Sequence, residues 1–153
     1  MITCLKGNKK VRGFTLIELL VVIGILAILL SIVLIAINPA RQFNQANNTK
    51  RRSDTTALLN AISQYGADHK GTLPANIPAT GSAEIASTGS DICSDILLTY
   101  IPALPVDPEL NNGAPITVCT SYSTGYNVSK DANNRVTVSA PSAKLGETIA
   151  ITR

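Results

Sequence analysis

The chain has 153 residues, which is room for one ordinary domain and one long helix and excludes a second catalytic domain. Its net charge of +3 is unevenly spread, because four of its 13 basic residues precede Phe14 and no acidic residue lies among them. The rest of the sequence carries a net charge of −1, so the basic balance does not indicate a nucleic-acid partner.

Residues 14–37 form an apolar run that is long enough to cross a lipid bilayer. As a helix this run extends about 36 Å, and the core of a bilayer is about 30 Å thick. The basic residues before the run favour a cytoplasmic N-terminus, which places everything after Asn38 outside the cytoplasm. We therefore expect a single-pass protein of the inner (cytoplasmic) membrane with its N-terminus inside. The basic residues are Lys6, Lys9, Lys10 and Arg12.

The junction between the basic segment and the apolar run reads Lys-Lys-Val-Arg-Gly-Phe-Thr-Leu-Ile-Glu from Lys9 to Glu18. This stretch closely resembles the N-terminal signal of type IV pilins and type II secretion pseudopilins. The resemblance implies that prepilin peptidase cleaves between Gly13 and Phe14 and that the new amino group of Phe14 is N-methylated. Residues 1–13 are then a cleaved basic leader, and the apolar run is the transmembrane and filament-core helix.

An acidic residue, Glu18, lies at the fifth position of the apolar run. An unpaired carboxylate at the centre of a bilayer costs about 3 kcal/mol, so Glu18 needs a partner or contact with water. The resemblance implies a partner, the charged amine of Phe14 in a neighbouring subunit, and a role for both residues in assembly. The alternative is that Glu18 reaches water at the cytoplasmic interface.

Asn38 and Pro39 interrupt the apolar helix, because proline removes a backbone hydrogen bond and clashes with the preceding turn. We expect a kink or local unwinding there, or a new helix that starts at Ala40. Residues 38–70 are predicted as an amphipathic helix of the stalk and head. Its apolar stripe consists of Leu58, Ala61, Ile62 and Tyr65.

The polar faces of this helix carry a basic run of Lys50, Arg51 and Arg52. On an amphipathic helix such a run is expected on a solvated or inter-subunit face. His69 is the single histidine, and we expect it as a surface residue or a C-terminal cap, not as a ligand or a base. The remaining charged residues on these faces are Arg41, Asp54 and Asp68.

Residues 71–153 are predicted as an exported globular head. A loop rich in Gly, Ala, Ser, Thr and Pro spans 72–90, and a short helix is expected over 94–100. The prolines in 101–108 enforce an extended course, which resembles the approach to the sheet in major pseudopilins. The inward residues of the short helix are expected to be Ile96, Leu97 and Tyr100.

Alternating β-branched and aromatic residues predict a small antiparallel sheet in the last third of the chain. The expected strands cover 116–118, 126–128, 135–139 and 149–151, with a turn from Asp131 to Asn134. The amphipathic helix is expected to cover one face of this sheet. The fold class is therefore α+β, a long N-terminal helix with a transmembrane half and an amphipathic half, packed on a small antiparallel sheet.

Cys93 and Cys119 lie far beyond the apolar run, whereas Cys4 lies in the leader. An exported pair predicts a Cys93–Cys119 disulfide, and two buried thiols are the alternative. Such a bridge leaves the last strands outside its loop and differs from the usual pilin bridge near the C-terminus. No further cysteine or nearby histidine completes a metal-ligand set.

No pattern in the sequence indicates catalysis, since there is no convincing nucleophile and base pair and no phosphate-binding glycine loop. We therefore predict no catalytic residue, no cofactor and a protein that is not an enzyme. Calcium stays open, because major pseudopilins as a family hold it in a C-terminal loop. Asp107, Glu109 and Asp131 could supply oxygen ligands if they lie together, or they could be ordinary turn residues.

The resemblance implies a structural subunit of a type IV pilus-like filament, held first in the bilayer and then in an extracytoplasmic or cell-surface filament. Its implied partners are prepilin peptidase, further copies of itself, minor pilins, and the inner-membrane assembly platform with its ATPase. One alternative is a type II secretion pseudopilin that forms a periplasmic pseudopilus. An alternative of another class is a monomeric membrane-tethered binding domain.

Overall fold

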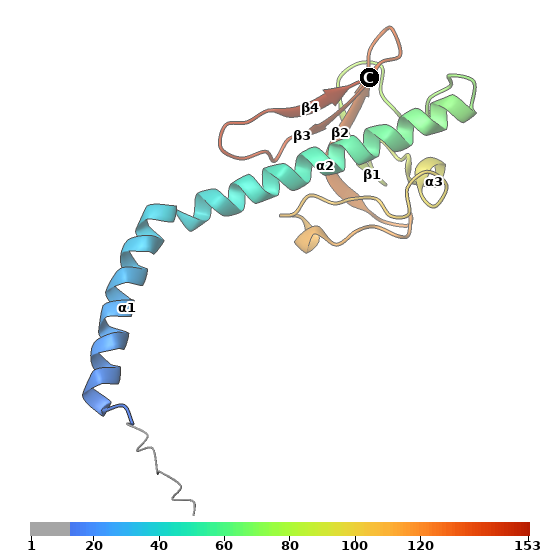
Figure 1. Ribbon diagram of the computed structural model, residues 1–153. Helices are drawn as coiled ribbons and strands as arrows, with labels where there is room; N and C mark the ends of the chain where they lie inside the picture. Colours follow the sequence, from blue (N-terminus) through green and yellow to red (C-terminus); the bar gives the residue numbers. More distant parts are fainter. Residues whose placement is uncertain (1–12) are drawn as a thin grey trace, which may run out of the picture. The chain divides into compact units, whose positions relative to one another are not determined.

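The computed structural model describes residues 13–153, so the leader before Gly13, with Cys4, lies outside the described residues. The chain divides into two compact units between Pro39 and Ala40 (Figure 1). The second of these, residues 40–153, is called the C-terminal unit below.

Helix α1, Leu16–Ile37, contains almost only aliphatic side chains and buries none of them. It begins after Thr15, whose extended backbone and side chain cap the first turn. It ends before Asn38, which adopts a left-handed conformation with φ 47°. A helix that is apolar all round and has no buried face is typical of a segment that packs against lipid or against other chains.

Helix α2, Pro39–Asp68, starts with a proline, which is favoured at the first helical position because its missing N–H needs no partner there. The expected interruption of the long helix therefore falls at Asn38. The predicted apolar stripe packs into a core, with Leu58, Ala61 and Ile62 buried.

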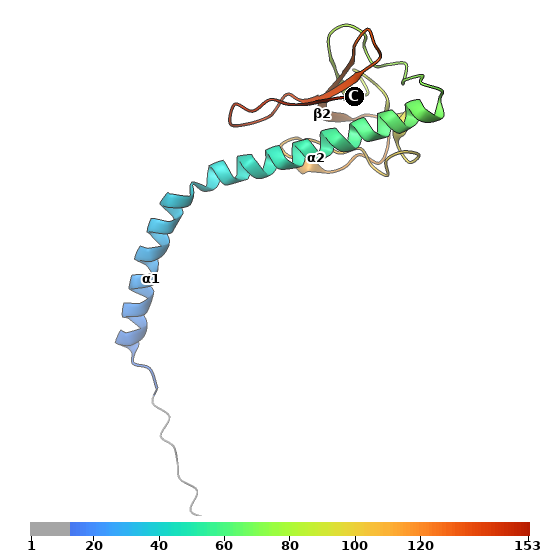
Figure 2. The same cartoon turned by 45° about the horizontal axis from the view of Figure 1, so that its top comes forward.

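Four antiparallel strands form one sheet in the order β1-β2-β3-β4. They are β1 (Ala83–Ala86), β2 (Ser123–Lys130), β3 (Val136–Ala140) and β4 (Ile149–Thr152). Buried side chains alternate with more exposed ones along β2 and β3, as expected of a sheet that turns one face to a core. Figures 1 and 2 both show α2 running alongside this sheet.

Helix and sheet share one hydrophobic core. The buried residues of α2 lie in the same cluster as Tyr126 and Val128 of β2 and Val138 of β3. This arrangement has the predicted α+β class, a long apolar helix followed by a helix packed on an antiparallel sheet. Two short elements complete the C-terminal unit, the helix α3 (Cys93–Ile96) and the 3₁₀ turn η1 (Asn111–Gly113).

Two of the strand assignments made from sequence are wrong. The segment 72–90, predicted as loop throughout, contains β1, which pairs with β2. Residues 116–118 do not form a strand, since only Ile116 makes an isolated antiparallel bridge, with Leu104. The next hydrogen-bonded pair of such a ladder would need an N–H from Pro102, which proline lacks.

The other three predicted strands are confirmed as β2, β3 and β4, and Asp131 forms the predicted turn before β3 by accepting the N–H of Asn133 at 2.8 Å. The helix predicted over 94–100 is shorter. It ends at Ile96, and Leu98 adopts a left-handed backbone conformation with φ 66°. Of the residues expected to point inward, Ile96 and Leu97 are buried and Tyr100 is half-buried.

Candidate functional site

The N-terminal end of α1 holds the residues of the predicted processing and assembly site. The backbone N–H of Thr15 donates to Oε2 of Glu18 at 2.8 Å, and the Thr15 hydroxyl donates to the same oxygen at 2.7 Å. In return, Oγ1 of Thr15 accepts the backbone N–H of Glu18 at 3.2 Å. This reciprocal capping box satisfies two backbone donors at the helix start and holds the Glu18 carboxylate at the first turn.

Phe14 and Glu18 lie on the same side of this helix end. They line a shallow groove of about 380 Å³, whose other residues are Ile17, Val21 and Val22. The preceding residue, Gly13, has open space around it, because no described atom lies within 4 Å of the position that a side chain would take. Glycine is therefore not required there by local packing, and the backbone of the Gly13–Phe14 junction is accessible to an enzyme.

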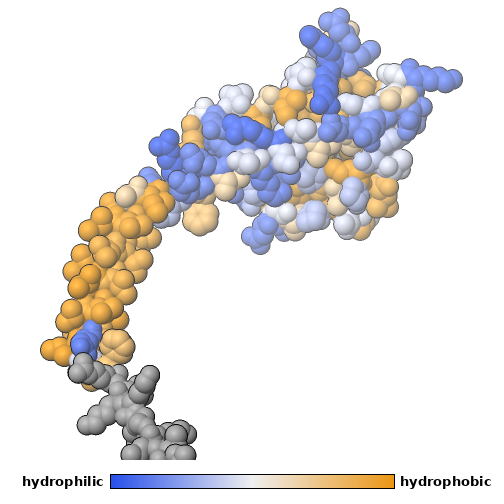
Figure 3. Space-filling view, in the orientation of Figure 1, coloured by the Kyte–Doolittle hydropathy of each residue, from blue (hydrophilic) through white to orange (hydrophobic). Residues whose placement is uncertain are grey.

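Helix α1 is long and apolar enough to cross a membrane, because its 22 residues include one acidic side chain, that of Glu18, and no basic one. It is the one such helix among residues 13–153. Figure 3 shows apolar surface along its length, interrupted by hydrophilic surface near its N-terminal end. The helix therefore presents an apolar surface that no described part of its own chain covers.

Residues 8–34 match the family described as the prokaryotic N-terminal methylation motif. The match includes the Gly13 junction, the capping box and most of α1. No curated protein and no solved structure matches the chain. The chain thus carries a prepilin-type cleavage and methylation signal, which implies processing by prepilin peptidase. This signal and the α+β fold are consistent with the type IV pilin and pseudopilin family.

The C-terminal unit contains the predicted disulfide between Cys93 and Cys119, whose Cα atoms are 5.7 Å apart. Cys93 is fully buried, and its backbone N–H donates to the hydroxyl of Tyr122 at 3.3 Å. That hydroxyl donates to Asp91 at 2.8 Å, and burial together with this bond raises the pKa of Tyr122. The bridge joins α3 to the approach to β2, and strands β2, β3 and β4 follow it in the chain.

The prediction that the whole basic run of α2 lies on a solvated or inter-subunit face is wrong at Arg51, whose side chain is fully buried. Its Nε donates to Oδ2 of Asp107 at 2.7 Å, and its Nη2 donates to Oδ1 at 2.9 Å. Arg51 also donates to Oε2 of Glu109 and to Oδ1 of Asn48, both at 3.2 Å. The bidentate ion pair with Asp107 explains how a guanidinium group is accommodated inside the protein.

Further contacts tie the segment after β3 to the same part of α2. Nζ of Lys144 lies 2.9 Å from Oε2 of Glu109, and the side-chain amide of Asn48 donates to the Lys144 carbonyl at 2.9 Å. At the surface, Arg52 pairs with Glu147 at 2.6 Å. Three segments that are far apart in sequence thus meet in one polar cluster. We call the group Asn48, Arg51, Asp107, Glu109 and Lys144 the α2 polar cluster.

The charges in the α2 polar cluster stabilise one another. Burial alone would raise the pKa of Asp107, but hydrogen bonds from Arg51 and from the backbone of Glu109 lower it overall. The hydrogen bonds to Asp107 raise the pKa of Arg51. Hydrogen bonding to Lys144 is the main cause that lowers the pKa of Glu109. The Arg51–Asp107 pair is therefore ionised at neutral pH.

A buried tyrosine hydroxyl extends this network toward the sheet. Tyr126 of β2 is fully buried and donates to Oδ2 of Asp54 at 2.8 Å, and Lys50 donates to the same oxygen at 2.9 Å. Burial and the neighbouring carboxylate raise the pKa of Tyr126. Within residues 13–153 every buried side-chain nitrogen and oxygen has a hydrogen-bond partner. The polar side chains inside the C-terminal unit therefore do not carry the cost of an unmade hydrogen bond.

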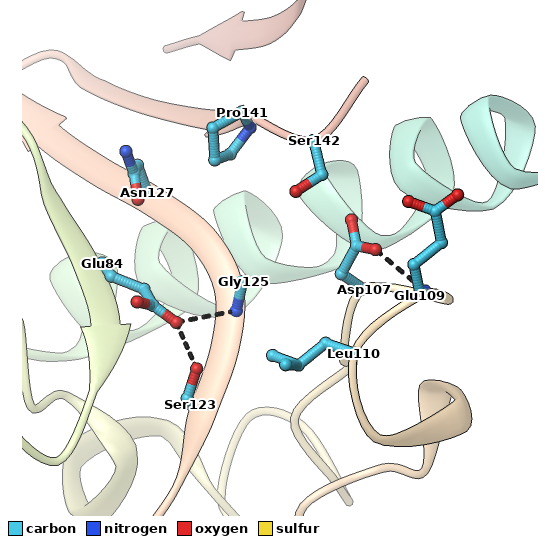
Figure 4. Close-up of a pocket in the computed structure, with 9 residues that line it drawn as sticks. All are labelled: Glu84, Asp107, Glu109, Leu110, Ser123, Gly125, Asn127, Pro141 and Ser142. Carbon is cyan, nitrogen blue, oxygen red and sulfur yellow. Dashed lines mark hydrogen bonds between the residues drawn. The ribbon is translucent and has the colours of Figure 1, made fainter. Parts of the chain in front are cut away.

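A cavity of about 360 Å³ opens beside the α2 polar cluster (Figure 4). Two of the carboxylates in its wall, those of Asp107 and Glu109, already bind Arg51. The third, that of Glu84, accepts the Ser123 hydroxyl and a backbone N–H of β2, as the dashed lines in Figure 4 mark. The lining residues are Glu84, Asp107, Glu109, Leu110, Ser123, Gly125, Asn127, Pro141 and Ser142.

The three residues considered as calcium ligands do not form one site. Asp107 and Glu109 belong to the α2 polar cluster, whereas Asp131 lies in the turn before β3 and accepts from Nε of Arg135 at 2.7 Å. No group of three His, Cys, Asp or Glu side chains within 13–153 is placed to hold a metal ion. Each of these acids has a structural partner instead.

His69 lies at the C-terminal end of α2, exposed as expected. Its Nδ1 lies 2.8 Å from the carbonyl oxygen of Tyr65, and its ring stacks on the Tyr65 ring at a centroid distance of 3.9 Å. The backbone N–H of His69 also donates to that carbonyl, at 3.0 Å. The residue therefore takes part in ending the helix.

Proposed function

We propose that this chain is a structural subunit of a type IV pilus-like filament. Prepilin peptidase removes residues 1–13 and methylates the amine of Phe14, and the mature chain assembles through residues 14–37. The amphipathic helix of 38–70 and the head of 71–153 then form the outer layer of the filament. The observation that carries this proposal is an uncovered apolar helix that bears the methylation motif.

The surface of α1 supports assembly through this helix. Its large aliphatic side chains are each about half exposed or more, so they need either lipid or other helices around them. A signal that is cut before the apolar run keeps this helix in the product. A bundle of such helices replaces lipid contacts with contacts between subunits, and the removal of apolar surface from water holds the bundle together outside the membrane.

Glu18 supports a defined register in this bundle. Its carboxylate is bound by Thr15 and has no cationic partner among residues 13–153. Cleavage creates a positive amine at Phe14, and the amine of a neighbouring subunit is the partner that we assign to Glu18. Between packed helices this attraction is strong, and a shifted helix leaves both charges unpaired. The pair therefore selects one axial arrangement.

A secretion pseudopilin is the second candidate. The proline-rich segment 101–108, which leads to the sheet, favours it, because that segment resembles the approach to the sheet in major pseudopilins. The Cys93–Cys119 disulfide favours the pilus, since a disulfide in the head is commoner in pilins than in pseudopilins. Both candidates share the processing step and the filament core.

The proposed location changes during the life of the subunit. It starts as a single-pass protein of the inner (cytoplasmic) membrane with its N-terminus inside and ends in an extracytoplasmic or cell-surface filament. The assigned partners are prepilin peptidase, further copies of the chain, minor pilins, and the assembly platform with its ATPase. We assign it no catalytic role.

Co-expression with a prepilin peptidase tests the proposal. Intact-mass measurement is expected to show a chain that begins at Phe14 and carries one added methyl group, and electron microscopy of sheared material is expected to show filaments. A Gly13→Leu variant is the matched control, because it leaves α1 intact while the bulky side chain obstructs the junction; it should insert in the membrane uncleaved. An unprocessed wild-type chain, or one that begins beyond Asn38, refutes the proposal.

Complementation separates the candidates. The gene is placed in one host that lacks its major pilin and in another that lacks its major pseudopilin, and surface filaments and protein secretion are measured. Restored surface filaments support the pilus subunit, and restored secretion supports the pseudopilin. A chain that stays unprocessed and monomeric in both hosts supports the membrane-tethered binding domain instead.

A further inference from the structure

One asparagine of the chain is followed directly by glycine, in the pair Asn112–Gly113. Asparagine is among the chemically labile residues of proteins. Its carboxamide carbon can be attacked by the backbone nitrogen of the next residue, and glycine leaves that nitrogen most accessible because it has no side chain. Among the asparagines of this sequence, Asn112 is therefore the one most open to such an attack.

The structure places Asn112 in an exposed turn. The residue lies in the middle of η1, and its side chain is exposed to solvent. Its carboxamide makes no hydrogen bond to any residue within 13–153. Neither burial nor a bonding partner therefore holds this group away from the backbone nitrogen of Gly113.

The backbone of η1 is left-handed over three successive residues. Asn111, Asn112 and Gly113 have φ angles of 48°, 52° and 67°. This conformation is unfavourable for residues that have a Cβ atom, although asparagine tolerates it better than most. Two backbone bonds close the turn, from the N–H of Gly113 to the carbonyl of Leu110 at 2.9 Å and from the N–H of Ala114 to the carbonyl of Asn111 at 3.1 Å. An exposed turn with so few bonds opens at low cost in free energy.

Opening of the turn decides when the nitrogen of Gly113 can react. In the closed turn its N–H is bound to Leu110, so the nitrogen does not readily lose its proton. An open turn frees the N–H and lets the carboxamide rotate toward the nitrogen. The rest of the loop can stay in place meanwhile, because Asp107 is held by Arg51 at 2.7 and 2.9 Å.

We propose that Asn112 deamidates in the folded protein and that the product places a negative charge within reach of Lys50. The nitrogen of Gly113 gives its proton to water and forms a bond to Cγ of Asn112. Ammonia leaves, so a five-membered succinimide ring joins the two residues. Water then adds to one ring carbonyl and breaks its C–N bond, which yields aspartate or isoaspartate. The net reaction exchanges the amide for a carboxylate, and water is the only co-reactant.

Lys50 lies against this turn. A Cβ atom added to Gly113 would stand 3.7 Å from Cε of Lys50. Nζ of Lys50 pairs with Oδ2 of Asp54 at 2.9 Å, and its side chain is nearly half exposed. The hydroxyl of Tyr126 donates to the same oxygen of Asp54. A carboxylate at position 112 attracts the Lys50 ammonium and competes with Asp54 for it.

The modification changes a part of the chain that carries no charge of its own. Residues 110–129 contain no Asp, Glu, Lys or Arg, and the reaction changes the net charge of residues 14–153 from −1 to −2. Isoaspartate also routes the main chain through the side chain, which alters the spacing that closes η1. The reaction takes place within the C-terminal unit, so it does not depend on assembly into a filament.

Incubation of the purified full-length chain in detergent tests the proposal. The folded protein is kept for days in mildly alkaline water that carries heavy oxygen, and samples are digested at low pH, where the Gly113 nitrogen keeps its proton. Mass spectrometry is expected to find the peptide with residue 112 as the acid, with heavy oxygen in its new carboxylate. The modified chain should co-elute with an Asn112→Asp variant in anion-exchange chromatography.

Asn134 is the matched control within the same molecule. It is also exposed and left-handed, with φ 60°. The next residue, however, is Arg135, whose side chain obstructs the approach and whose backbone N–H donates to Asp131 at 2.9 Å. Position 134 should convert at least about tenfold more slowly than position 112, a difference in barrier of about 1.4 kcal/mol.

Thermal unfolding tests the contact with Lys50. Lys50→Met is introduced into the wild-type chain and into the Asn112→Asp variant. The substitution should lower the unfolding temperature more in the variant, because Lys50 there has a second carboxylate beside it. Equal shifts in the two backgrounds would show that the new charge lies out of reach of Lys50.

Two results overturn the deamidation itself. A folded chain without heavy oxygen at position 112 overturns it, and conversion of the denatured chain alone would then mean that the closed turn protects Asn112. Equal conversion at positions 112 and 134 shows that neither the glycine nor the turn selects the site. Both results leave the proposed filament subunit standing, and a chain that forms no filament can still deamidate at Asn112.

Discussion

The guanidinium of Arg51 and the carboxylate of Asp107 face each other inside the protein, 56 residues apart in sequence, with Nε 2.7 Å from Oδ2. The arginine comes from the middle of α2, and the aspartate follows the proline-rich segment that leads toward the sheet. Both side chains are almost completely shielded from solvent. This pair therefore fixes the position of a loop on a helix at a depth where neither charge is stable alone.

Breaking this pair from one side is expected to destabilise the C-terminal unit strongly. Arg51→Met leaves the Asp107 carboxylate buried without its cation, a change that typically costs about 3 to 5 kcal/mol. The double variant Arg51→Met, Asp107→Leu removes both charges and should recover most of this loss. Thermal unfolding of the full-length chain in detergent, followed by circular dichroism, measures both.

Arg52→Met is the matched control for this experiment. Arg52 is next in sequence and pairs with Glu147, but more than half of its side chain is exposed, so the substitution is expected to cost less than about 1 kcal/mol. Equal losses of stability for Arg51→Met and Arg52→Met would show that the burial of Arg51 does not increase the cost of replacing it.

Acid should weaken the same unit. The pKa of Asp107 is below its ordinary value in the folded chain, so the unfolded chain binds the proton more readily. The stability from this carboxylate is therefore complete above the unfolded pKa of about 4 and is lost as the pH falls through the folded value. Unfolding temperatures measured between pH 7 and pH 3 should fall more steeply for wild type than for Asp107→Asn; parallel curves would contradict this assignment.

The disulfide is expected to contribute about 3 kcal/mol to the stability of the C-terminal unit, because it closes a loop with a sequence separation of 26 residues. Cys93→Ser together with Cys119→Ser should lower the unfolding temperature accordingly. Alkylation of native material gives an independent measurement. Both thiols should resist labelling until a reductant is added, and immediate labelling of both would show that the bridge does not form.

Glu18→Ala should separate membrane insertion from assembly. The variant keeps the apolar helix and the Gly13 junction, so insertion and cleavage are expected to persist. Its Phe14 amine has no counter-charge in the filament, and the loss of one partner of a buried pair costs about 3 to 5 kcal/mol for each contact. The yield of sheared filaments should fall while the membrane fraction rises. Filaments at normal abundance would mean that Glu18 is only an interfacial residue.

Glu18→Gln refines this experiment. The amide keeps an oxygen that can accept from Thr15, so the capping box can persist while the negative charge is gone. If Glu18 acts through its charge, the glutamine variant should assemble as poorly as the alanine variant. If it acts only by capping the helix, the glutamine variant should assemble normally.

The N-terminal part of the molecule could be predicted from sequence, because the residues that determine its structure are close to one another in the chain. An unbroken apolar run fixes α1, and Pro39 fixes the break. The capping box was missed, although Thr15 and Glu18 stand at the spacing of a Ser/Thr-x-x-Glu motif that precedes an apolar run. The motif could therefore have indicated how the Glu18 carboxylate is held.

The C-terminal unit was harder to predict from sequence, because its buried polar side chains form ion pairs and hydrogen bonds with residues that are remote in the chain. Arg51 resembles its exposed neighbours in a basic run, and only the approach of Asp107 distinguishes it. Strand β1 was missed for a related reason. Its Ala-Glu-Ile-Ala sequence has little intrinsic strand preference, and pairing with β2 makes it a strand.

The position of the disulfide also decides how the unit responds to mechanical load. A chain that is pulled straight gains about 3.4 Å of length for each residue released, but the segment between Cys93 and Cys119 stays closed while the bridge is oxidised. About 90 Å of potential extension is therefore withheld from each subunit. Strands β2, β3 and β4 lie outside the bridge and can still be drawn out, so under tension the covalent link limits how far a subunit lengthens without preventing the sheet from opening.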